Sequence, residues 1–292
     1  MTASPASAPK IHRKHFLWAG ATIAVLAIAW MILRPDRIAQ LDEVPPELIA
    51  QVEAAIPMSR PTSTVSFRFR ESSDGSLFIR KQFVEAVTPS ILRRNTKRYN
   101  AVNEIGVLEE TTSLSIGPIQ FVSHYREPLP LIGDLLPNHF WTTRTLKLFE
   151  AKPVTRFPGL TGETFEAKLV SELRYSNGEL RALEESRLVC TSLERVPARN
   201  VHASLTGEAV KVRCEDSGAL NSALAGNLAR ALGDEAGLKK SVHVVLTESW
   251  YIEDLAMSIQ TLLQEEIKDA DFGSTEFTTA LRTLERVDVK RR

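Results

Sequence analysis

The most uneven distribution of hydrophobic and polar residues lies near the start of the chain. Residues 16–33 (FLWAGATIAVLAIAWMIL) are eighteen consecutive positions without a charged side chain. A helix of that length reaches roughly 27 Å, close to the ~30 Å hydrocarbon core of a bilayer. Trp18 and Trp30 stand near its two ends, where indole rings prefer the interface. The pattern predicts a single transmembrane helix over 16–33.

The charges that flank this run predict its orientation. The excess of Lys and Arg is on the amino-terminal side, at Lys10, Arg13 and Lys14. Because basic residues stay on the cytoplasmic side, we expect residues 1–15 to be a disordered cytoplasmic tail. The bulk of the chain is then periplasmic, at a bacterial inner membrane.

A cleavable signal peptide is the alternative interpretation of the same run. Residues 27–29 (AIA) match a cleavage site. Cleavage there would leave the apolar residues 30–33 exposed at a new amino terminus. This cost favours the uncleaved anchor.

After the anchor, the hydrophobic period becomes helical and then changes to two. Residues 34–60 contain apolar positions at helical spacing after Pro46, which predicts a membrane-proximal helix and linker. From 61 to 127, apolar and polar residues alternate as in Val65, Phe67 and Phe69, which predicts a first antiparallel β region.

The remainder of the chain predicts a second β region over 141–292. Residues 128–140 (PLPLIGDLLPNHF) are rich in proline, and we expect them to connect the two regions. Leucines at every fourth position indicate an accessory helix near 219–232, and the segment from 275 favours a strand. The predicted fold class is therefore mainly β: one transmembrane helix and an extracytoplasmic antiparallel β domain, in one sheet or two sub-sheets, with a few short helices.

Two hairpins have turn sequences that predict their registers. At Asp74-Gly75, a three-residue loop would pair Phe69 with Ile79 and keep apolar residues on one face, so we predict it over a two-residue loop. At Asn177-Gly178, a two-residue turn predicts the pairs Phe165–Cys190, Ala167–Leu188, Leu169–Ser186, Leu173–Ala182 and Tyr175–Leu180.

The chain has two cysteines, Cys190 and Cys214, and both fall on apolar sides of predicted strands. Outside the cytoplasm disulfides persist. The chain has no C-x-x-C spacing, the pattern that would indicate a metal site. We therefore predict a Cys190–Cys214 disulfide.

Charge and motifs exclude several function classes. Lys plus Arg and Asp plus Glu both number 36, so no global basic field attracts nucleic acid. No hydrolase, zinc or nucleotide-binding motif occurs, and the histidines share no ligand spacing, so we expect no metal and no cofactor. The basic cluster Arg93, Arg94, Lys97 and Arg98 is interpreted as the solvated side of a strand; the alternative is contact with an anionic partner.

The densest mixed cluster is ESWYIED, residues 248–254. Aromatic rings stack on sugars and carboxylates transfer protons, so Trp250, Tyr251 and Glu253 are the candidate ligand-binding residues. The simpler interpretation is a strand that ends in a core tryptophan and a polar turn. A glycosidase also needs a second carboxylate, which the sequence does not identify.

The leading functional hypothesis is a non-catalytic, membrane-anchored binding or scaffolding protein of the cell envelope. Its partner would be an envelope protein, a lipid or a polysaccharide, held near by the anchor. The alternative is a β half-barrel or sandwich that holds a lipid or other apolar ligand. A third hypothesis is an envelope hydrolase that uses carboxylates near Trp250.

Overall fold

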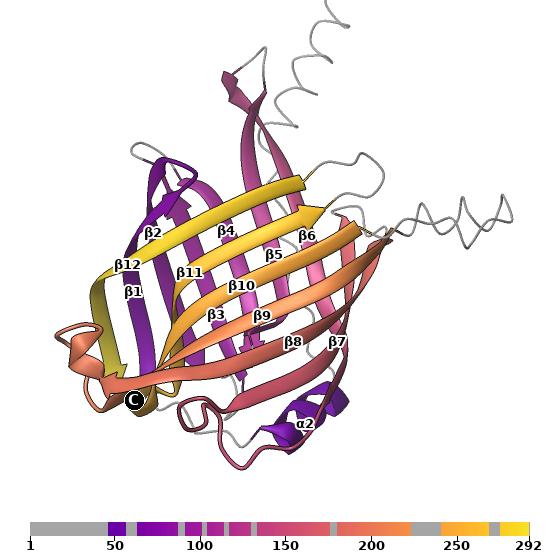
Figure 1. The fold of residues 1–292 in the computed structure, drawn as a ribbon. Coiled ribbons are helices and arrows are strands. Elements are labelled where there is room, and N and C mark those ends of the chain that lie inside the picture. The colour runs from indigo at the N-terminus through magenta and orange to yellow at the C-terminus, as the bar shows by residue number, and fades with distance from the viewer. Residues whose placement is uncertain are drawn as a thin grey trace, which may run out of the picture. The chain divides into compact units, whose positions relative to one another are not determined.

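The computed structural model describes residues 46–56, 63–86, 91–100, 104–113, 117–129, 133–175, 180–222, 241–268 and 275–291 (Figure 1). The chain divides into two units, residues 1–38 with 128–137 and residues 39–127 with 138–292. Apart from the ends of two strands, the sheet described below belongs to the second unit.

Within the described ranges the secondary structure is almost entirely β. There are one helix, two 3₁₀ turns and twelve strands. The elements are α2 (Pro46–Ala55), β1 (Ser63–Ser73), β2 (Ser76–Ala86), β3 (Ile91–Tyr99), β4 (Glu104–Ser113), β5 (Gly117–Leu129), β6 (Gly133–Ala151), β7 (Thr164–Tyr175), β8 (Leu180–Pro197), η1 (Ala198–Asn200), β9 (Glu208–Ser222), β10 (Ser241–Ile252), η3 (Glu253–Leu255), β11 (Met257–Lys268) and β12 (Thr275–Arg291).

The strands form one antiparallel sheet that closes on itself. Their order is β1-β12-β11-β10-β9-β8-β7-β6-β5-β4-β3-β2, so β1 pairs with both β2 and β12. This confirms the predicted mainly β, antiparallel fold and places both predicted β regions in a single sheet. Much of the segment 128–140, predicted to be a connection, lies in β5 and β6.

A row of directly paired residues identifies the enclosed face of this sheet. Its buried members alternate with exposed residues such as Glu166 and Arg213. Because a closed sheet encloses one face, we call the side that carries this row the inner face. The row crosses seven neighbouring strands at Phe165, Cys190, Cys214, Thr247, Leu263, Ala280 and Ser73.

The β7–β8 hairpin confirms most of the predicted register. The pairs Phe165–Cys190, Ala167–Leu188, Leu169–Ser186 and Leu173–Ala182 all occur. Nearer the turn the ladder shifts, and Leu180 pairs with Arg174 instead of Tyr175. The predicted register therefore holds from Leu173 to Phe165 and fails at the pair nearest the turn.

The β1–β2 hairpin has the register that we predicted against. Asp74 and Gly75 form a two-residue turn with φ of 49° and 80°, and Phe69 pairs with Arg80. Positive φ at both central residues is typical of a type I′ turn. The prediction was wrong because it assumed an apolar inner face, whereas Arg80 has an acidic partner there.

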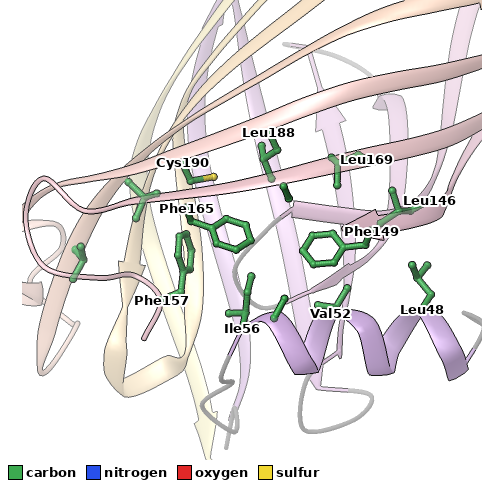
Figure 2. Close-up of a cluster of buried hydrophobic side chains, with 14 residues drawn as sticks. Leu48, Val52, Ile56, Leu146, Phe149, Phe157, Phe165, Leu169, Leu188 and Cys190 are labelled. Carbon is green, nitrogen blue, oxygen red and sulfur yellow. The ribbon is translucent and has the colours of Figure 1, made fainter. Parts of the chain in front are cut away.

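The helix α2 begins at the predicted proline and packs on the inner face of β6–β9. Its residues Leu48, Val52 and Ala55 are buried, and Val154 donates a backbone hydrogen bond to the Ala55 carbonyl at 2.9 Å. Figure 2 shows the apolar side of the helix facing Phe149, Phe165 and other sheet residues. This first cluster comprises Leu48, Val52, Ala55, Ile56, Leu146, Phe149, Phe157, Phe165, Ala167, Leu169, Leu188, Cys190, Val210 and Val212.

A second cluster gathers around the paired ends of β1 and β12. The 3₁₀ turns η1 and η3 lie beside this cluster, and the candidate site is in the same part of the fold. Its members are Val65, Phe67, Phe69, Val84, Leu92, Ala198, Leu205, Ala209, Ile252, Leu255, Met257, Ile259 and Val287.

The remaining sequence predictions have different outcomes. The Cys190–Cys214 disulfide is present, between directly paired residues of β8 and β9, and the segment from 275 is the strand β12. Of the predicted helix 219–232, residues 219–222 belong to β9 and the rest lies outside the described residues. The predicted anchor 16–33 lies outside them too. In the described ranges, no helix has the length and apolar character needed to cross a bilayer.

Candidate functional site

The three candidate ligand-binding residues lie where β10 ends. Trp250 and Tyr251 are consecutive strand residues and therefore project to opposite faces. Tyr251 is buried, and Glu253 begins the 3₁₀ turn η3 that follows. The sequence cluster is thus divided among two faces and a turn.

A cleft of about 430 Å³ lies beside Trp250, between β8, η1, β10, β11 and β12. Trp250 is part of its lining, whereas Tyr251 and Glu253 are not. The ligand-binding role of each of these residues stays a prediction. The lining consists of Glu194, Val196, Asn200, Val201, Trp250, Thr261, Arg282, Thr283 and Leu284.

The acidic residues around Trp250 are engaged with partners. Glu253 accepts hydrogen bonds from Arg156 and Arg195, both at 2.6 Å. Asp254 accepts one from the Thr206 hydroxyl at 2.7 Å. These carboxylates connect β8, the segment before β7 and the 200–207 segment to η3.

Glu248 is also committed, and its protonation state follows from its partners. Arg213 lies 2.5 Å away and the Lys211 amine 3.2 Å away. The hydrogen bond from Arg213 is the main reason that the pKa of Glu248 is lowered; partial burial opposes the shift, and Lys211 adds to it. A lowered pKa keeps the carboxylate ionised, which suits an ion pair and not a general acid.

A second concentration of charge lies on the inner face, around Glu71. This carboxylate is 2% exposed and contacts three guanidinium groups: Arg98 at 2.7 Å, Arg282 at 2.7 Å and Arg80 at 3.5 Å. Burial alone would raise the pKa of Glu71, but Arg282, then Arg80 and Arg98, outweigh it, and the pKa is lowered. The cluster connects four neighbouring strands, β3, β2, β1 and β12.

Two of the four basic residues of β3, Arg94 and Arg98, have partners on the inner face, which the sequence interpretation missed. Arg93 and Lys97 are exposed, as predicted for a solvated side. Arg98 instead meets Glu71 and lies over the Phe78 ring at 3.7 Å, and Arg94 donates to the Ser258 carbonyl on β11 at 3.3 Å. The signal was the period of two, which assigns residues 94 and 98 to the face opposite 93 and 97.

His243, interpreted from sequence as an ordinary imidazole, is held between two carboxylates on the inner face. Its Nδ1 lies 3.0 Å from Glu184 on β8, and its Nε2 lies 2.8 Å from Glu265 on β11. Since both ring nitrogens face acceptors, only the protonated ring satisfies both contacts. Burial lowers the pKa of His243, but the hydrogen bonds to Glu184 and Glu265 outweigh it and raise the pKa to about 9.

Gly218 provides the space that this arrangement needs. It pairs with both Ser186 and His243, so it lies between them on β9. A Cβ at Gly218 would approach the Ser186 Cβ to 2.7 Å. Because that volume is empty, the imidazole reaches from β10 across β9 to Glu184 on β8.

The raised pKa makes a pH-dependent prediction for stability. Since the pKa of His243 is about 9 in the folded chain and 6.5 ordinarily, its stabilisation is complete below about pH 6.5 and disappears as the pH rises through about 9. We expect His243→Gln to lower the free energy of unfolding by about 1–3 kcal/mol at pH 6 and by much less at pH 10. Urea denaturation at both pH values measures this, and an equal difference at the two would contradict it.

The described residues thus include a mixed polar and aromatic cleft and two charge clusters, around Glu71 and His243, that join strands. The clusters were predictable only in part, because each combines strands far apart in sequence. No protein family model, no curated protein and no solved structure matches this chain.

Proposed function

We propose that this chain is a membrane-anchored, non-catalytic binding or scaffolding module of the bacterial cell envelope. The observation that supports it best is the engagement of the acidic residues 248–254. Glu248 and Glu253 are ion-paired, and Asp254 is hydrogen-bonded. A general acid must hold its proton near neutral pH, and the lowered pKa of Glu248 disfavours that role.

The compartment is supported by two independent features. The Cys190–Cys214 disulfide favours an oxidising environment such as the periplasm. The apolar run at 16–33, preceded by basic residues, favours an anchor with a cytoplasmic amino terminus. An anchored domain concentrates its binding surface near envelope partners.

Topology and partners are tested together in living cells. The full chain carries a carboxy-terminal reporter that is active only in the periplasm, with a reporter that is active only in the cytoplasm as the matched control. We expect activity from the first, an untrimmed amino terminus, and specific envelope partners after crosslinking and mass spectrometry. A trimmed chain released from the membrane, or a cytosolic carboxy terminus, would contradict the proposal.

A second candidate function, holding a lipid or other apolar ligand, is favoured by α2. The helix covers an apolar cluster on the inner face, and displacing it would expose Phe149, Phe165 and Leu169. Against this, Phe67 and Phe69 pack in the other cluster, so the buried apolar residues are divided between two packed regions. Native mass spectrometry of the chain extracted from membranes tests it: a bound lipid supports this candidate, and a bare chain opposes it.

A further inference from the structure

We propose that the cleft beside Trp250 binds an uncharged carbohydrate ring, with the indole as its stacking platform. This inference rests on the proposed function, since it names a polysaccharide as the ligand of the envelope module. It comes from the volume of the cleft, the chemistry of its lining and three strand irregularities at its border.

Three strands each carry one extra residue at the border of the cleft. On β8, Leu193 has no partner in the pairing with β9 and stands beside Glu194. On β11, Thr261 is the extra residue in the pairing with β10. On β12, Glu285 is the extra residue in the pairing with β1 and stands beside Leu284. Glu194, Thr261 and Leu284 all line the cleft. A bulge redirects side chains locally and is enriched at binding sites, so three at one place indicate that the sheet is shaped there.

The apolar part of the cleft is supported from beneath. Val196, Val201, Trp250 and Leu284 are half-buried and pack against the second cluster. The indole is therefore held in place before any ligand arrives, which reduces the entropy lost on binding. The Lys211 amine lies 5.9 Å from the centre of the indole ring and adds a second restraint.

The polar part of the cleft offers donors and acceptors of the kind that hydroxyl groups need. Asn200 contributes an amide, Thr283 a hydroxyl and Glu194 a carboxylate. The Thr261 hydroxyl donates to the Glu248 carbonyl at 3.2 Å, which leaves its oxygen able to accept. An aromatic plane beside amide, hydroxyl and carboxylate groups matches the apolar face and hydroxyl rim of a pyranose.

The charges of the cleft disfavour an anionic ligand, since its lining contains the Glu194 carboxylate. Arg282, which lines it, is already committed to Glu71 at 2.7 Å and also donates to Gln260. Its positive charge is therefore balanced within the protein. A volume of about 430 Å³ falls within the size range of small-ligand sites.

The test is a ligand-detected NMR titration of the full chain in detergent micelles. The probes are cellotriose, N,N′,N″-triacetylchitotriose and maltotriose, with succinate as an anionic comparison. We expect saturable binding of at least one trisaccharide, with a Kd of about 0.1–10 mM, and no saturation by succinate. Trp250→Ala should weaken binding by about tenfold and Trp250→Phe by about threefold. Phe277→Ala, which removes an exposed aromatic ring of β12 outside the lining, should leave the Kd unchanged.

Two further arms keep the outcome decisive. If Trp250→Ala fails to fold, judged by its melting curve, Asn200→Ala takes its place and should weaken binding at least about threefold. Failure of every trisaccharide to bind the wild-type chain, or equal binding by wild type and the lining variants, overturns the inference. If the topology and crosslinking results hold while all trisaccharides fail, only the carbohydrate site is rejected. If a trisaccharide binds but the carboxy terminus is cytosolic, the proposed function is the part that fails.

Discussion

Replacing Glu71 with glutamine is expected to lower the free energy of unfolding by about 3–5 kcal/mol, because it leaves buried guanidinium groups without their shared counter-charge. Arg282 is 5% exposed and Arg80 11% exposed, so water cannot replace the carboxylate for either of them. The substitution also removes the ion pairs that join β1 to β2, β3 and β12. Urea denaturation of the full chain in micelles at pH 7 measures the loss.

The pH dependence separates this electrostatic cause from a packing effect. The pKa of Glu71 is lowered in the folded chain, so its stabilisation is present above about pH 4.5, its ordinary value, and is lost as the pH falls through the folded value. The difference between wild type and Glu71→Gln should therefore shrink in acid. Asp288→Asn is the matched control: Asp288 is 52% exposed in its pair with Arg286, and its loss should cost less than about 1 kcal/mol. Equal losses for the two variants would refute the assignment.

Local signals in the sequence predicted the parts of the fold that depend on neighbours in the chain. The Asn177-Gly178 sequence and the alternation on either side predicted the β7–β8 pairs from Leu173–Ala182 to Phe165–Cys190. The spacing after Pro46 predicts α2, since proline at the start and an apolar stripe are properties of the segment itself. In each case the stabilising contacts lie within a few residues or one hairpin.

Predictions failed where the partner of a residue is remote in sequence. The closure of the sheet pairs Ser63 with Arg291, and no local pattern announces such a contact. The prediction of the β1–β2 register was wrong for the same reason. Arg80 on the inner face is stabilised by Glu71, and Glu71 also pairs with Arg282 near the other end of the chain. A rule that expects apolar residues on the enclosed face cannot anticipate a buried ion-pair cluster.

The candidate site shows a similar division. The sequence predicts Trp250 as a candidate ligand-binding residue, and Trp250 lines the cleft. Tyr251 was grouped with it although successive strand residues face opposite ways, and Glu253 serves as an ion-pair partner of Arg156 and Arg195. The cleft itself depends on extra residues in three strands, and a bulge leaves no clear sequence signature when the surrounding residues keep a strand-like composition.

Removing the disulfide with Cys190→Ala and Cys214→Ala together is expected to lower the free energy of unfolding by about 3–4 kcal/mol. The bond closes a loop with a sequence separation of 24, and in the chain-entropy model that constraint on the unfolded chain accounts for the value. Cys190 is also 1% exposed within the cluster under α2, so alanine there adds a small packing loss.

Chemical denaturation of wild type and double variant, each with and without reductant, separates the two contributions. Reductant should destabilise wild type by nearly the full amount and leave the double variant unchanged, because only the wild type has a bond to reduce. The residual difference between reduced wild type and the variant is then the packing loss, which we expect to stay below about 1 kcal/mol. If reductant leaves wild type unaffected, and both thiols react with an alkylating agent in the native chain, the bond is not formed in the cell and the oxidising compartment loses its strongest structural support.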